Sequence, residues 1–220
     1  MEMRKAKQEI IIAAASAWLI MLGWRLLAPV LVQNLPPSAV QVVNIISIYS
    51  IALFPLWLIL RRKEKMSDYG ITAQNLPKQV GVGILIGLGM GCVLTLLPMA
   101  LGLKQLIYTG SGFQSVREAT ERLAYFILVI GLVEEFIFRG FLYTRLKGIC
   151  LSDAAPILLS SALFGVFHFS GLNFTQVLTT GLIGAFFCLC RERIPSCTLL
   201  SLVIAHGLHD WLIRLCSTFF

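Results

Sequence analysis

Two adjacent glutamates, Glu134 and Glu135, lie in the middle of a long apolar stretch, and Arg139 follows about one helical turn later. A carboxylate at the centre of a membrane-spanning helix costs about 3 kcal/mol on insertion scales, so two in succession need a structural or chemical reason. Residues four apart share a helix face, and we therefore expect Glu135 and Arg139 to form a structural ion pair. Glu134 is rotated by about 100° from Glu135, which leaves it as the working carboxylate.

Further ionisable residues lie in two later apolar segments and include all three histidines of the chain. His168 lies in one segment, and His206 and Asp210 share one helix face in the other. With a rise of 1.5 Å per residue, Glu134, His168 and Asp210 lie about 20 Å from the predicted cytoplasmic ends of their helices, and His206 about 15 Å. These matched depths predict one site near the middle of the membrane. His209 is about 60° away from the face of His206 and Asp210, and its role stays open.

These residue types suit hydrolysis. A buried carboxylate can act as a general base or acid, a histidine opposite it can hold a water, and a second histidine can donate to a developing oxyanion. Alternatively, Glu134, His168 and His206 could bind zinc and leave one position for water. The sequence contains no His-Glu-x-x-His zinc motif, no serine nucleophile elbow and no glycine-rich phosphate loop after a strand.

The composition indicates a membrane protein. Of its 220 residues, 57% are hydrophobic and 13% are charged, against about 25% charged in soluble domains. A spanning helix needs about 20 apolar residues. We interpret 1–220 as one membrane domain, with N-terminal spans and loops in 1–121 and a candidate catalytic core in 122–216. The fold class is predicted to be all-α, a polytopic bundle of about seven transmembrane helices near 10–32, 38–60, 79–103, 122–147, 154–170, 174–190 and 196–216.

The N-terminus is predicted to be cytoplasmic, because this orientation places most of the 18 Lys and Arg residues in cytoplasmic loops. Lys104, Arg117 and Arg122 then fall in outer loops. The first apolar run is interpreted as an uncleaved span, since its Ala-Ser-Ala follows too short an apolar region for a signal peptide. The basic residues are spread over separate loops, which argues against nucleic-acid binding.

The third apolar segment carries three glycines four residues apart, Gly83, Gly87 and Gly91. A face of small residues lets a neighbouring helix approach closely. We expect this face to pack against another helix of the same chain, and dimerisation through it is the alternative.

The C-terminal half contains three motifs, Glu134-Glu135-x-x-x-Arg139, Phe164-x-x-x-His168 and His206-x-x-x-Asp210. They resemble those of the CAAX-protease and bacteriocin-processing family. This family of intramembrane endopeptidases includes the Ras-converting CAAX protease. The order and separation of the motifs fit the family over about residues 120–216, whereas the first three segments match only in general character.

The resemblance implies an all-helical membrane protease that cuts peptide bonds in a cavity open to the cytoplasm. Glu134 and His168 would activate the water, and His206 with the residue at 210 would stabilise the oxyanion. Asparagine is frequent at that last position, where this chain has Asp210. An ionised aspartate cannot donate a hydrogen bond, so Asp210 would instead orient His206 or be protonated. The family includes both metalloprotease and metal-free descriptions; we expect no cofactor here, with zinc as the alternative.

We therefore expect an integral, multi-pass protein, in a bacterial cytoplasmic membrane, that hydrolyses small peptides or the tails of membrane-associated proteins. Its partners would be the lipid bilayer and a peptide or protein substrate with a C-terminal tail or a leader. A prenylated CAAX tail, a bacteriocin leader and a signalling pro-peptide all fit. One alternative is a proton-coupled transporter, because intramembrane Glu and His residues also relay protons, although no inverted repeat is evident. The other is a non-catalytic peptide-binding or bacteriocin-immunity protein.

Overall fold

The structure is a computed structural model that describes residues 2–103, 107, 111–171 and 173–219. All regular elements among these residues are helical, which confirms the predicted all-α class. Lys104, predicted in an outer loop, lies outside the described residues. The chain forms two compact units, Met1–Thr72 with Val133–Ile194 and Ala73–Leu132 with Pro195–Phe220. The interpretation of 1–220 as one membrane domain stays a prediction.

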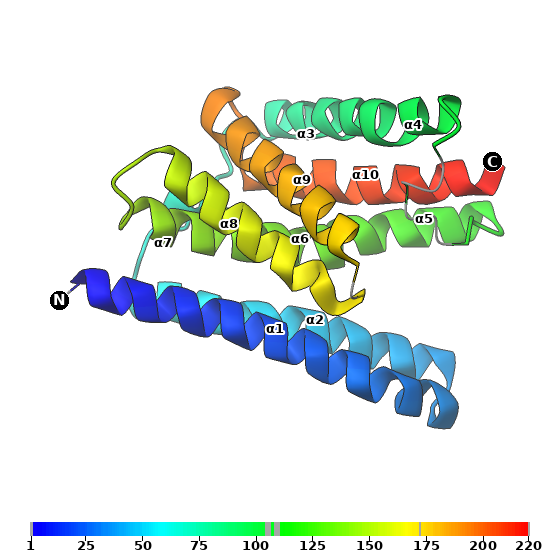
Figure 1. The fold of residues 1–220 in the computed structure, drawn as a ribbon, viewed down its shortest axis with the longest axis horizontal. Coiled ribbons are helices and arrows are strands. Elements are labelled where there is room, and N and C mark those ends of the chain that lie inside the picture. Colours follow the sequence, from blue (N-terminus) through cyan, green and yellow to red (C-terminus); the bar gives the residue numbers. More distant parts are fainter. Residues whose placement is uncertain (1, 104–106, 108–110, 172, 220) are drawn as a thin grey trace. The chain divides into compact units, whose positions relative to one another are not determined.

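The first unit contains two helical hairpins (Figure 1), together with the helical stretch 133–147 described below. α1 (Glu2–Asn34) and α2 (Pro37–Arg61) form the first hairpin, drawn in blue. Pro37 begins α2, where a missing backbone N–H leaves no hydrogen bond unmade. The short 3-10 helix η1 (Met66–Tyr69) follows this hairpin. The second hairpin consists of α8 (Ala154–Phe167) and α9 (Phe174–Arg193), with the 3-10 turn η6 (His168–Gly171) between them.

The second unit places two helices beside α10 (Leu199–Phe219), as Figure 1 shows. One is α3 (Leu76–Met90), which continues as the π-helix η2 (Gly91–Leu96) and α4 (Leu97–Ala100); the other is α5 (Val116–Tyr125) with the π-helix η4 (Phe126–Gly131).

The glycine face of α3 lies directly on α10. A Cβ atom added to Gly83 would come within 2.6 Å of the Ser201 carbonyl oxygen, and one on Gly87 within 3.0 Å of the Ala205 carbonyl oxygen. The absence of a side chain at these two positions lets the helix backbones approach closely. The expectation that this face packs within the chain is therefore confirmed.

Five helices in the described part of the chain are long and apolar enough to cross a membrane. They are Met3–Asn34, Pro37–Arg61, Leu76–Ala100, Phe174–Arg193 and Leu199–Phe219. The chain is thus an integral, multi-pass membrane protein, while the number of seven spans and the cytoplasmic N-terminus stay predictions.

The other two segments expected to span the membrane are helical as well. The first lies in an unbroken run from Val116 to Lys147, made of α5, η4, α6 (Leu132–Glu135), the π-helix η5 (Phe136–Leu142) and α7 (Tyr143–Lys147). The second, 154–170, is shorter than predicted, because α8 has 14 residues and ends at Phe167. Its length of about 21 Å is less than the ~30 Å of a hydrocarbon core.

Candidate active site

Glu134 and Glu135 end the short helix α6 and lie between the π-helices η4 and η5. Interruptions of this kind occur frequently at functional sites. The sequence predicted an uninterrupted α-helix here. The pattern carried no signal of the change, because 116–147 contains no proline that would disturb the hydrogen bonding.

The predicted ion pair between Glu135 and Arg139 forms and is fully buried. Arg139 donates from Nη1 to Glu135 Oε1 at 3.0 Å, and both residues are 0% exposed. The Arg139 guanidinium carbon also lies 4.0 Å from the ring centre of Phe164 and 5.3 Å from that of Phe187. These contacts connect η5 with α8 and α9, so the charged pair joins three helices of the first unit. Sequence reasoning missed Phe187, because an aromatic residue in a membrane helix carries no distinguishing signal.

Glu134 lies next to His168, as the depth argument predicted for these two residues. The Glu134 Oε2 and His168 Nε2 atoms are 3.7 Å apart, and the two side chains are 13% and 22% exposed. The distance is longer than a direct hydrogen bond. Rings of Phe164 and Phe167 pack edge-on against the imidazole, with centroid distances of 4.7 and 5.4 Å. The two residues therefore form a partly accessible pair with an apolar wall on the histidine side.

The orientation of His168 is fixed by a hydrogen bond from its other ring nitrogen. His168 Nδ1 lies 2.9 Å from the Phe164 carbonyl oxygen, which can only accept. Nδ1 must therefore carry the proton in this bond, and in the neutral ring Nε2 presents a lone pair. That lone pair lies on the side of Glu134. Glu134 and His168 consequently present two hydrogen-bond acceptors close together, which suits binding one hydrogen-bond donor molecule between them.

In the second unit, Asp210 lies close to two histidines of α10. The distance from His206 Nε2 to Asp210 Oδ2 is 3.5 Å, and that from His209 Nδ1 to Asp210 Oδ1 is 3.8 Å. Both histidines are buried, at 8% and 5% exposed. The predicted shared face of His206 and Asp210 is therefore confirmed, and His209 lies next to the second oxygen of the same carboxylate.

Close packing against η4 holds this part of α10. A Cβ atom on Gly207, the neighbour of His206, would come within 2.6 Å of the Ile127 Cα. A Cβ atom on Gly131 would come within 2.8 Å of the Val203 carbonyl oxygen. Because the two helix backbones touch at both points, the depth of His206 relative to η4 is fixed by packing.

The candidate residues thus fall into two groups, one in each unit. Glu134, His168, Glu135 and Arg139 belong to the first unit, and His206, His209 and Asp210 belong to the second. That both groups line one cavity stays a prediction, as do the roles of the individual residues. Among the described residues, no group of three or more His, Cys, Asp or Glu side chains is arranged to hold a metal ion.

Comparison with known families agrees with the motifs. Residues 118–212 match the model of the family described as "Type II CAAX prenyl endopeptidase Rce1-like". No curated protein and no solved structure matches the chain. The matched stretch contains all three motifs in order, from the two glutamates to Asp210. Residues 118–212 are therefore similar to the Rce1-like family, over the stretch in which the motifs indicated a CAAX-type intramembrane endopeptidase.

Proposed function

We propose that this protein hydrolyses peptide bonds with a water that Glu134 and His168 activate together. The observation that carries the proposal is the 3.7 Å separation between Glu134 Oε2 and His168 Nε2. A water about 2.8 Å from each atom can donate one hydrogen to each, because both atoms are acceptors. Such a water has its oxygen lone pairs free for attack on a carbonyl carbon.

The reaction then follows from the residue types. Glu134 accepts a proton as the water oxygen bonds to the peptide carbonyl carbon, and His168 keeps the water in place. The carbonyl oxygen becomes an oxyanion, which a doubly protonated His206 stabilises by donating from Nδ1. The carbon–nitrogen bond breaks, and Glu134 returns its proton to the leaving amine.

Asp210 acts in this proposal as an acceptor that orients His206. Its Oδ2 lies 3.5 Å from His206 Nε2, so the ring's Nδ1 faces the opposite direction. An ionised carboxylate in this position balances the positive charge of the doubly protonated ring. Asp210 thereby supports the oxyanion through His206 and needs no hydrogen of its own.

We assign no metal to this reaction. The pair in the first unit offers two metal-binding atoms, whereas catalytic zinc sites have three protein ligands. Zinc would need His206 from the second unit as its third ligand. Metal analysis of the purified, active protein tests this choice, and stoichiometric zinc whose removal abolishes hydrolysis would contradict it.

The substrate class follows from the membrane location and the family. We propose that the protein cleaves the C-terminal tail of a membrane-attached peptide or protein in a bacterial cytoplasmic membrane. A lipid-modified tail holds its scissile bond close to the bilayer, which raises its effective concentration at an intramembrane site. A prenylated CAAX peptide is the first substrate to test, and an unmodified leader peptide is the comparison.

The decisive variant is Glu134→Gln, which keeps the shape and removes the base. In nanodiscs, we expect it to cut the rate of peptide cleavage at least about 100-fold, with unchanged thermal unfolding. His168→Ala should lose activity similarly, and the double variant should lose little more, because the two residues act on one water. The matched control is Glu121→Gln, whose exposed carboxylate pairs with Arg117 and whose loss should leave the rate unchanged.

Three outcomes would contradict the proposal. Cleavage by Glu134→Gln at the wild-type rate would show that Glu134 is not the general base. Wild-type protein that binds peptide without cleaving it would indicate a non-catalytic binding protein. Proton flux in liposomes without hydrolysis would indicate a transporter.

A further inference from the structure

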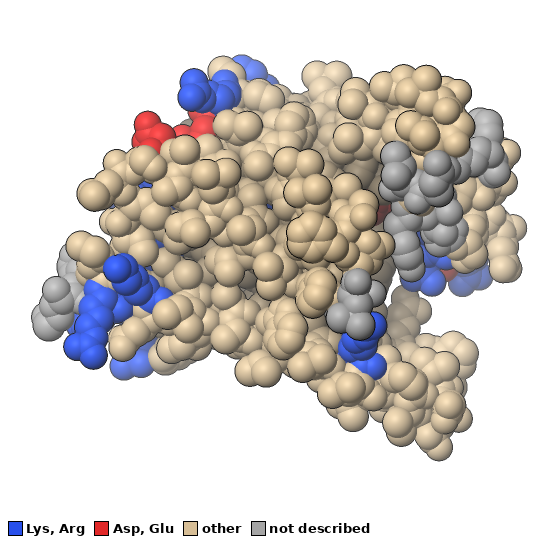
Figure 2. Space-filling model, in the orientation of Figure 1, with Lys and Arg blue, Asp and Glu red and all other residues tan. Residues whose placement is uncertain are grey.

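Six exposed cations gather at one end of the α1–α2 hairpin, and no part of the proposed reaction uses them. They lie on the first two turns of α1 and around the last turn of α2, and Figure 2 shows Lys and Arg side chains at the N-terminal end of α1. We call this group the cationic end; its members are Arg4, Lys5, Lys7, Arg61, Lys63 and Lys65.

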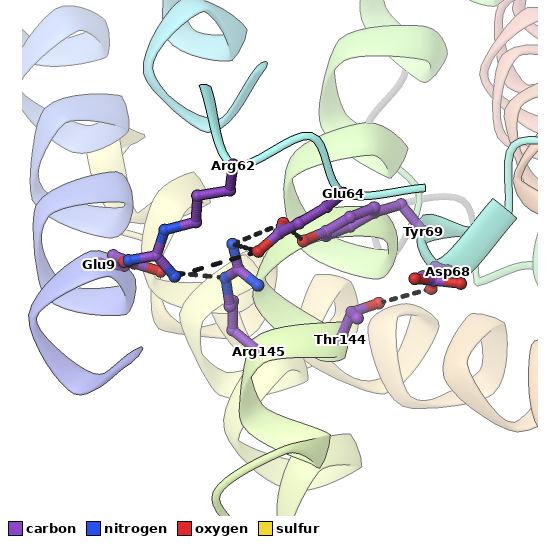
Figure 3. Close-up of polar contacts among 7 residues, drawn as sticks. All are labelled: Glu9, Arg62, Glu64, Asp68, Tyr69, Thr144 and Arg145. Atoms are coloured by element: carbon purple, nitrogen blue, oxygen red, sulfur yellow. Dashed lines mark hydrogen bonds and ion pairs between the residues drawn. The ribbon is translucent and has the colours of Figure 1, made fainter. Parts of the chain in front are cut away.

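The neighbouring carboxylates of Glu9 and Glu64 do not offset these charges, because both carboxylates are paired with two other arginines, Arg62 and Arg145. Glu9 forms ion pairs with Arg62 and with Arg145, the latter at 3.1 Å (Figure 3). Glu64 accepts hydrogen bonds from Arg145 at 2.9 and 3.0 Å and from the Tyr69 hydroxyl. Burial raises the pKa of Glu64, but these two donors hold it below its ordinary value overall, so the carboxylate remains ionised in its pair.

The cationic end therefore keeps its charge. Among the described residues, none of its six members has a carboxylate as an ion-pair partner. Glu2 precedes these cations in the sequence, and Asp68 is an exposed acid in the chain segment that follows. Six positive charges against two negative charges still leave a cationic surface at this end of the hairpin.

A tryptophan marks the depth of this surface. Trp57 is 50% exposed, and the Arg61 guanidinium carbon lies 4.9 Å from its ring centre. Exposed tryptophans in membrane helices are enriched at the level of the lipid headgroups. The contact between Glu9 and Arg62 brings the start of α1 to the same level. Arg4, five residues before Glu9, lies about 7.5 Å farther along the axis, which matches the ~5–7 Å of a headgroup layer.

We propose that the cationic end binds the headgroups of anionic phospholipids in the adjoining leaflet. The phosphodiester of such a lipid carries one negative charge, which arginine contacts with two parallel hydrogen bonds and lysine as a point charge. Clusters of four to eight basic residues next to a spanning helix recognise anionic lipids in this way.

Lipid binding at this position also acts on the first unit. The same hairpin is joined through Glu9 and Glu64 to Arg145 of α7, on the helical run that carries Glu134. A bound headgroup holds the two hairpin ends together and adds stability in proportion to its occupancy. Anionic lipid should therefore raise the unfolding temperature of the protein independently of any peptidase activity.

The test compares two double variants that each remove two cations. Lys63→Gln/Lys65→Gln removes two members of the cationic end. Lys78→Gln/Arg193→Gln removes two exposed cations that are not part of it. Full-length protein is reconstituted with phosphatidylglycerol and phosphatidylcholine, retained lipids are counted by native mass spectrometry, and unfolding temperatures are measured in nanodiscs of each lipid.

We expect the wild type to retain phosphatidylglycerol in preference to phosphatidylcholine. Each removed cation should weaken retention about fivefold, so Lys63→Gln/Lys65→Gln should bind about 25-fold more weakly and lose most of the gain in unfolding temperature. The control should behave as the wild type. Should the first variant fail to fold, Lys63→Arg/Lys65→Arg should fold and keep the lipid preference.

Equal retention of both lipids by the wild type would overturn the proposal. Equal losses in both double variants would also overturn it, because they would reflect net charge alone. Displacement of phosphatidylglycerol by millimolar inorganic phosphate would overturn it as well, since the surface would then recognise a free anion. Loss of cleavage in Glu134→Gln has no bearing on these measurements.

Discussion

Replacing Arg139 by methionine should destabilise the protein severely, because the substitution leaves a buried carboxylate without its counter-charge. Glu135 and Arg139 are both 0% exposed, and their charged atoms are 3.0 Å apart. Removing one partner of a buried pair costs about 3–5 kcal/mol. Loss of the stacking contact between the guanidinium and Phe164, at 4.0 Å, adds about 0.5–2 kcal/mol. The sum is comparable with the whole stability of many proteins, about 5–15 kcal/mol.

A second substitution separates the electrostatic from the packing contribution. Glu135→Gln combined with Arg139→Met removes the buried negative charge, so the double variant should be more stable than Arg139→Met alone by at least about 2 kcal/mol. Arg139→Lys keeps the charge but loses the planar stacking on Phe164, and it should fall between the wild type and Arg139→Met. Unfolding in mixed detergent and sodium dodecyl sulfate, followed by circular dichroism, measures the wild type, these three variants and Glu135→Gln alone.

The reasoning predicts a strong coupling between the two residues, and additivity would refute it. If the double variant is as unstable as the sum of the two single variants, the buried charge is not the reason for the loss. If the free energy of unfolding of Arg139→Met lies within about 0.5 kcal/mol of the wild-type value, the pair contributes no more than an exposed ion pair does.

Two further measurements test the glycine packing between α3 and α10 and the ion pair between Glu64 and Arg145. Gly83→Ala should destabilise by about 1–3 kcal/mol, since its Cβ would meet the Ser201 carbonyl oxygen at 2.6 Å, whereas Gly89→Ala, with nothing within 4 Å, should be neutral or gain up to about 1 kcal/mol. Equal effects in thermal unfolding would contradict the close approach. The pKa of Glu64 is lowered in the folded protein, so its contribution is present above pH 4.5 and is lost as the pH falls through the lower folded value. The unfolding temperature, measured between about pH 3 and 7, should therefore fall less steeply toward low pH in Glu64→Gln than in the wild type. The same pH dependence in both proteins would contradict the pairing of Glu64 with Arg145.

Local rules were sufficient to predict the helices and the pairs within them. Hydropathy located all seven helical segments, because each contains a long run of apolar residues. Spacing by four residues predicted the contacts of Glu135 with Arg139 and of His206 with Asp210. Both rules depend only on neighbours along the chain.

Matched depth predicted the contact of Glu134 with His168, but other contacts between helices were beyond the sequence pattern. The ring of Phe187, the second aromatic side chain next to Arg139, comes from α9, far along the chain from η5. The network of Glu9 with Arg62 and Arg145 joins residues more than 50 positions apart. Periodicity contains no information about such pairs, because they depend on which helices become neighbours.

The early end of α8 has a local cause that hydropathy does not detect. His168 bonds the Phe164 carbonyl oxygen with its ring, at the position where an α-helix would use the backbone N–H of residue 168. That backbone N–H bonds the Gly165 carbonyl oxygen instead, as in a 3-10 turn. The histidine thus ends its own helix, and this geometry also leaves Nε2 on the side of Glu134.

The two neighbouring glutamates differ in chemistry because a different side chain lies beside each of them. Glu135 faces a guanidinium, which does not release its proton, and the pair stays charged and buried. Glu134 faces an imidazole that is stable in the neutral form, and its side chain remains partly exposed. A base must accept a proton and give it back within one reaction, which a carboxylate held by arginine does poorly. Substitutions of the two glutamates should therefore have different effects. Glu135 variants should lose stability first, and Glu134 variants should lose activity in a protein that still folds.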